Sequence, residues 1–118
     1  MDLTQLVAEV GEWSFNNFGP QESWKPLLGA VEEIGELCHA HLKQAQSIRT
    51  TEDHQAAKED AVADILIYLA DYCHKENIPM GQVLKDVWLK VSKRDWKKDP
   101  AKGGMGASQM LTIGENDA

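Results

Sequence analysis

Three glutamates lie close together in VEEIGELCHAHLKQ, residues 31–44. At about 100° of rotation per residue in an α-helix, Glu33 and Glu36 point within roughly 60° of each other. Glu32 lies directly before them. Helical spacing therefore predicts a small group of carboxylates on one side of this helix.

A second acidic group follows in KEDAVADILIYLADYCHKE, residues 58–76. Asp60, Asp64 and Asp71 fall within a wedge of roughly 40° if this segment is helical. Lys75 lies four positions after Asp71, where it can offset that charge. Two consecutive apolar helices thus each carry an acidic side.

These two acidic sides are suited to a divalent cation. Like charges at positions i and i+4 destabilise a helix by roughly a few tenths of a kcal/mol, and a cation held between the helices would remove that repulsion. Hard carboxylate oxygens suit Mg²⁺ or Mn²⁺, and Mg²⁺ typically keeps several waters and takes substrate phosphates as further ligands. The pattern predicts a site for a dication and a polyphosphate, although an acidic side opposite an apolar one is also typical of an ordinary surface helix.

The chain that positions these groups is expected to form four helices. Apolar residues recur at helical spacing in segments of approximately 3–16, 23–45, 52–77 and 83–98. Gly19 and Pro20 break the first helix, and Thr51 is a plausible N-cap for the third. The expected core positions of the second and third helices are Leu27, Val31, Ile34, Cys38, Leu42, Ala45, Val62, Leu66, Leu69 and Cys73.

No segment alternates with the two-residue period of a strand. The predicted fold class is therefore all-α, with a four-helix bundle-like domain over residues 1–98. Residues 99–118 are rich in glycine and small side chains, so we expect them to form a loop or flexible tail.

Composition narrows the classes of function. The 118 residues are enough for one domain, and the formal net charge of −7 argues against generic binding to nucleic acid or to an anionic membrane. The longest apolar run, Ile65–Ala70, is too short to span a bilayer, and no signal peptide is visible. Cys38 and Cys73 lie within apolar helical patterns, which favours reduced core thiols and a cytoplasmic location.

The order EEIGE, then EDAVADILIYLAD, then a basic fourth helix resembles the MazG-like all-α nucleotide pyrophosphohydrolases over residues 13–96. That family carries EExxE on one helix and ExxD on the next, on either side of Mg²⁺. The resemblance implies that Glu33 and Glu36 are metal ligands and that Asp64 is the aspartate of ExxD. Ala61 stands where the motif has Glu, and Asp60 is the natural substitute on the same face.

The resemblance also implies an activity. A nucleoside triphosphate would be cleaved between its α and β phosphates to a monophosphate and pyrophosphate, an activity that would clear unwanted nucleotides from the pool. Either Glu32 or Glu36 could orient the attacking water or take its proton. The family further implies a homodimer or homotetramer.

The phosphates of the nucleotide would need positively charged side chains, and its base would need an apolar slot. In the family reading, Lys93, Arg94 and Lys97 contact phosphates, although cations also stabilise a helix C-terminus without any ligand. Trp13 and Trp24 could line a base pocket, with Asn17 placed to read base edges. Aromatic residues in such a pattern also serve as ordinary core.

Two other functions fit parts of the pattern. The carboxylate-x-x-His pairs, Glu36 with His39 and Asp71 with His74, are typical of di-iron or manganese four-helix-bundle oxidoreductases. A non-catalytic helical interaction module would explain the helices but not the two acidic sides.

Overall fold

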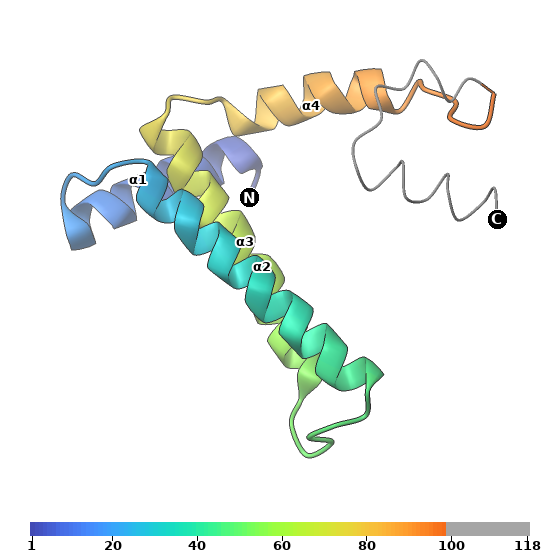
Figure 1. Cartoon of the computed structure of the whole chain (residues 1–118). Helices are drawn as coiled ribbons and strands as arrows, with labels where there is room; N and C mark the ends of the chain where they lie inside the picture. The colour runs from blue at the N-terminus through green and yellow to red at the C-terminus, as the bar shows by residue number, and fades with distance from the viewer. Residues whose placement is uncertain (99–118) are drawn as a thin grey trace. The chain divides into compact units, whose positions relative to one another are not determined.

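The computed structural model describes residues 1–98, which form four α-helices and no strand. The helices are α1 (Leu3–Phe18), α2 (Trp24–Ala45), α3 (His54–Lys75) and α4 (Met80–Val91) (Figure 1). The all-α prediction is confirmed for this part of the chain. Two units are distinguished, Met1–Val83 and a second one beginning at Leu84. The tail predicted for residues 99–118 lies outside the described residues.

Local side-chain chemistry sets the ends of α1. The Asp2 side chain accepts a hydrogen bond from the Gln5 N–H, and the Gln5 side chain accepts one from the Asp2 N–H, which forms a capping box. At the other end, Gly19 has a φ of 70°, a conformation that glycine adopts without a Cβ penalty. The predicted break at Gly19 is confirmed.

Two predicted boundaries are wrong. Asp53, rather than Thr51, caps α3, because its side chain accepts a hydrogen bond from the Ala56 N–H. Helix α4 ends at Val91 rather than near Lys98. Beyond it, the Asp95 side chain accepts the backbone N–H groups of Lys97 and Lys98, which offers the backbone an alternative to helical hydrogen bonds.

Helices α2 and α3 pack along each other (Figure 1), and each of them carries buried alanines. Ala30 and Ala40 of α2 and Ala61 and Ala70 of α3 are all buried. Helix α1 packs against α3, where a Cβ on Gly11 would overlap the ring of His74. The close approach of α1 to α3 therefore depends on the missing side chain of Gly11.

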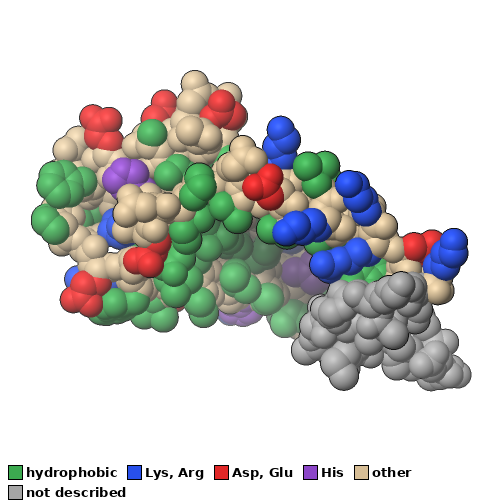
Figure 2. Space-filling model, turned by 90° about the horizontal axis from the view of Figure 1, so that it is seen from above, with side chains coloured by type: hydrophobic (Ala, Val, Ile, Leu, Met, Phe, Trp, Pro, Cys, Tyr) green, Lys and Arg blue, Asp and Glu red, His purple; other side chains and the backbone are tan. Residues whose placement is uncertain are grey.

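The predicted core of α2 is wrong for the single chain. All six predicted positions are exposed, and Val31 reaches 58% exposure. On α3, Val62 and Leu66 are also exposed, whereas Leu69 is half-buried and Cys73 is buried. The reason is that α2 turns its stripe of small residues toward α3 and its stripe of large apolar residues outward. Figure 2 shows many apolar side chains at the surface.

The two cysteines are free thiols with different surroundings. Cys73 is buried, which raises the pKa of its thiol. Cys38 is exposed, so its predicted place in the core is wrong. None of the helices in residues 1–98 is long and apolar enough to cross a membrane.

Candidate functional site

A cavity of about 470 Å³ lies within the first unit. This volume is in the range of small-molecule pockets. Its lining residues are Val10, Trp13 and Phe18 of α1, Gln21 of the following turn, Lys25, Pro26 and Glu33 of α2, and Asp64, Ile67, Tyr68 and Asp71 of α3. The cavity thus combines apolar and aromatic walls with three carboxylates.

Helix α3 presents one continuous stripe to this cavity. Asp64, Ile67, Tyr68 and Asp71 are spaced i, i+3, i+4 and i+7, so they share one face of the helix. A Cβ on Gly29 of α2 would overlap the Tyr68 ring, so the missing side chain leaves the space that this ring uses. The position of the cavity wall therefore depends on a glycine in the neighbouring helix.

Glu33 and Asp64 come from different helices and line the same cavity. Desolvation raises the pKa of Glu33 above its ordinary value of 4.5, and the negative charges of Asp64, Glu36 and Glu32 raise it further. The structure thus places these two predicted ligands close enough to repel each other. A cation between them would relieve this repulsion.

The other predicted metal-binding and catalytic carboxylates are not part of the cavity lining. Glu32, Glu36 and Asp60 are exposed, and the cavity lining does not include them. Ala61 is only 3% exposed, so the motif position that it occupies faces packed neighbours. Within residues 1–98, no group of three or more His, Cys, Asp or Glu side chains is arranged to hold a metal ion.

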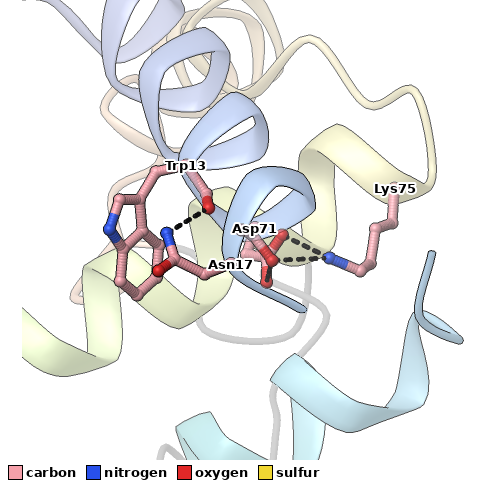
Figure 3. A network of polar contacts seen from close by, with 5 residues as sticks. Trp13, Asn17, Asp71 and Lys75 are labelled. Atoms are coloured by element: carbon pink, nitrogen blue, oxygen red, sulfur yellow. Dashed lines mark hydrogen bonds and ion pairs between the residues drawn. The ribbon is translucent and has the colours of Figure 1, made fainter. Parts of the chain in front are cut away.

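Asp71 joins α3 to α1 through a buried polar network. Ser14, 1% exposed, donates its hydroxyl hydrogen to Asp71 Oδ2 at 2.9 Å. Lys75 Nζ donates to Asp71 Oδ1 at 2.6 Å and to Ser14 Oγ at 3.1 Å. Figure 3 shows the ion pair of Asp71 and Lys75 in the same region as Trp13. The predicted offset of Asp71 by Lys75 is confirmed.

The aromatic part of the cavity is built mainly from α1. Trp13 and Phe18 form an edge-to-face pair with ring centroids 5.6 Å apart. Asn17 donates its side-chain N–H to the Trp13 carbonyl oxygen at 2.8 Å (Figure 3). Trp24 donates its indole N–H to Glu22 and is exposed. Of the three predicted base-pocket residues, Trp13 lines the cavity and Asn17 and Trp24 do not.

Sequence reasoning did not select several lining residues. Tyr68 could have been found, because it lies four positions after Asp64 on the same helical face. Gln21 and Lys25 had no such signal, since their place at the cavity depends on how the turn after α1 leads into α2. Lys25 is a cation in the cavity lining.

The predicted phosphate-binding residues belong to the second unit. Residues 84–98 contain six Lys and Arg against two Asp, whereas residues 1–83 contain five against fourteen Asp and Glu. The Arg94 guanidinium lies over the Trp96 ring at 5.8 Å. Lys93 and Lys97 are exposed. Their contact with phosphate stays a prediction.

No protein-family model matches the chain, and no curated protein or solved structure matches it. The fold and the cavity define an all-α protein with an acidic, partly aromatic pocket. The resemblance to MazG-like enzymes stays a prediction based on the sequence motifs.

Proposed function

We propose that this protein is a Mg²⁺-dependent nucleoside triphosphate pyrophosphohydrolase. The observation that carries the proposal is that Glu33 and Asp64, from consecutive helices, line one cavity and repel each other electrostatically. The motifs EEIGE and ADILIYLAD point to the same chemistry. The products would be a nucleoside monophosphate and pyrophosphate, and the biological role would be removal of unwanted nucleotides in the cytoplasm.

The residues at the cavity suit Mg²⁺, with Mn²⁺ as a substitute. Glu33 and Asp64 supply hard carboxylate oxygens from two helices, and Mg²⁺ is usually held by one or two carboxylates plus water and substrate phosphate. Glu36 remains a proposed further ligand. When bound, the ion would neutralise phosphate oxygens and lower the pKa of a water.

Each part of the site would have its own task. Glu36 or Glu32 would orient the attacking water and accept its proton, because both lie within one helical turn of Glu33. Trp13, Phe18 and Tyr68 would enclose the base. Lys25, which lines the cavity, would bind phosphates. Phosphate binding by Lys93, Arg94 and Lys97 of the second unit stays a prediction.

We also propose that the enzyme is a homo-oligomer, at least a dimer. The buried apolar side chains of the described residues are limited to Pro26, four alanines and Cys73, which is a small core for a chain of this length. The large apolar residues of α2, Leu27, Val31, Ile34 and Leu42, are exposed instead. A second copy of the chain would cover them, as in most closed soluble assemblies.

The test is a panel of canonical and modified nucleoside triphosphates, incubated with the purified full chain and Mg²⁺ or Mn²⁺. We expect the monophosphate and pyrophosphate, with loss of activity in excess chelator and recovery on adding Mg²⁺. Orthophosphate as the only product would contradict cleavage between the α and β phosphates. Activity that persists in chelator would contradict the metal.

A further inference from the structure

The cavity has two different acidic ends along α3. Asp64 lies beside Glu33, whereas Asp71 lies seven residues further on, which corresponds to about 10 Å along the helix. Tyr68 lies between them on the same face. Only the Asp64 end has a second carboxylate in the cavity lining, so the Asp71 end is a separate feature of the pocket.

The surroundings of Asp71 fix its carboxylate and balance its charge. Ser14 donates to one oxygen and Lys75 to the other, at 2.9 Å and 2.6 Å. Asp71 is 8% exposed and lines the cavity, whereas Lys75 is not part of the lining. The Lys75 charge therefore allows a neutral group to lie against Asp71 without a buried, uncompensated anion.

Asp71 keeps acceptor capacity toward the cavity. An ionised carboxylate has about four lone-pair sites, and the two hydrogen bonds described above use only part of them. It cannot donate, so a ligand group that contacts it must be a donor. The hydrogen bond from Ser14 ties Asp71 to α1, and Asp71 and Trp13 of α1 line the same cavity.

A planar ring beside Trp13 with an N–H group at its edge would contact the aromatic wall and donate a hydrogen bond to Asp71. We infer that Asp71 is a specificity-determining residue that selects nucleobases with an exocyclic amino group over those with a carbonyl there. A carbonyl oxygen against the Asp71 oxygens would place acceptors together, and this carbonyl would be left without a donor. This inference rests on the proposed function and identifies the class of base that the site takes.

The first test compares pairs of substrates that differ at this position. If the site accepts pyrimidines, we expect kcat/KM to be at least about tenfold higher for dCTP than for dUTP. If it accepts purines, we expect the same difference between dATP and dITP. Equal turnover of amino and carbonyl partners would overturn the inference while leaving the pyrophosphohydrolase proposal intact.

A second test separates base recognition from hydrolysis. Calorimetric titration of the full chain with dCMP, dUMP, dAMP and dIMP in chelator measures binding without metal or cleavage. Tighter binding of the amino member of a pair would support the inference even if no triphosphate were hydrolysed. Equal or weaker binding of the amino members would contradict it.

Variants then assign the preference to Asp71. In Asp71→Asn the side chain can donate toward the base, so the amino-to-carbonyl ratio should fall at least about fivefold, the direction expected when a matched hydrogen bond is lost. Ser14→Ala is the matched control, because it removes one hydrogen bond of the same network but keeps the carboxylate, and the amino preference should remain. A folded Asp71→Asn variant with the original ratio would overturn the assignment; if this variant does not fold, the substrate and monophosphate comparisons with the unaltered chain decide.

Discussion

Glu33 is a carboxylate whose ionisation is opposed by its surroundings. Desolvation and the charges of Asp64, Glu36 and Glu32 raise its pKa above 4.5 in the folded protein. A raised carboxyl pKa means that the folded state binds more protons than the unfolded state, so stability falls as the pH rises through the pKa of Glu33. The negative charge of Glu33 at neutral pH therefore lowers the stability of the folded state, and the proposed metal ion would offset this loss.

Glu33→Gln should consequently have opposite effects on stability and activity. Without metal we expect the variant to melt at a higher temperature than the original chain at pH 7.5, with the difference shrinking as the pH falls toward and below the pKa of Glu33. Mg²⁺ should raise the melting temperature of the original chain but not of the variant, because binding to the folded state stabilises it. Thermal melts at several pH values, with and without Mg²⁺, measure this; an equal Mg²⁺ effect on both proteins would argue against Glu33 as a ligand.

Asp60 and Asp64 provide a comparison on one helix. Asp64 lines the cavity and Asp60 does not, although both are exposed. We expect Asp64→Asn to reduce kcat/KM by at least about a hundredfold, in the range of losing one strong electrostatic contact to the transition state, and Asp60→Asn to reduce it much less. Steady-state kinetics with the best substrate of the panel decide; similar losses would restore Asp60 as a ligand in place of the Glu that the motif has at position 61.

The sequence predicted part of this site. Helical spacing identified Glu33 and Asp64 as members of the two acidic sides, because the angle between residues on a helix is nearly fixed. It could not show that Asp60 is outside the cavity lining or that Lys25 is part of it, because those facts depend on how two helices are rotated against each other. The partner of Asp71 on its own helix, Lys75, was predictable, whereas Ser14, 57 residues earlier, was not.

At the scale of elements, two glycines of α2 have contrasting surroundings. A Cβ at Gly29 would overlap the Tyr68 ring, whereas a Cβ at Gly35 would meet nothing within 4 Å. Gly29→Ala should destabilise the fold by about 1–3 kcal/mol through overpacking and should also lower activity, since Tyr68 lines the cavity. Gly35→Ala should instead stabilise it by up to about 1 kcal/mol, the difference in helix propensity.

Urea unfolding followed by circular dichroism measures both changes, and the same samples serve for activity. Gly35→Ala is the matched control because it makes the same substitution in the same helix. If Gly29→Ala were as stable and active as Gly35→Ala, the close approach of α2 to Tyr68 would be contradicted.

The helices themselves were largely predictable, and their contacts were not. Gly19 and the apolar spacing predicted the first helix within two residues of its end at Phe18. The same spacing assigned Leu27, Val31 and Ile34 to the core, although the chain buries Ala30 and Ala40 instead. Periodicity identifies the most apolar stripe of a helix, but it does not tell whether the neighbour that covers it belongs to the same chain.

At the scale of the whole molecule, that exposed stripe leads to a prediction about assembly. Val31→Glu would place a charge in the centre of the proposed contact between copies, and its burial there would be strongly unfavourable. We expect this variant to elute at a smaller mass than the original chain, measured by size-exclusion chromatography with light scattering. Gln44→Glu adds the same charge elsewhere on α2 and should leave the mass unchanged.

The original chain should also unfold at higher temperature as its concentration rises, because assembly stabilises the folded state by mass action. If the protein were a monomer at all concentrations, the proposed assembly would be contradicted. The description of the cavity would still hold, because its lining comes from one chain.

The buried alanines of α2 and α3 restrict how this protein can vary. Ala30, Ala40, Ala61 and Ala70 already have the smallest side chain that favours a helix, so only glycine is smaller, and it weakens the helix by about 1 kcal/mol. Any larger residue would overpack its buried surroundings. Substitution at these four positions is therefore unfavourable in both directions, whether the new side chain is larger or smaller.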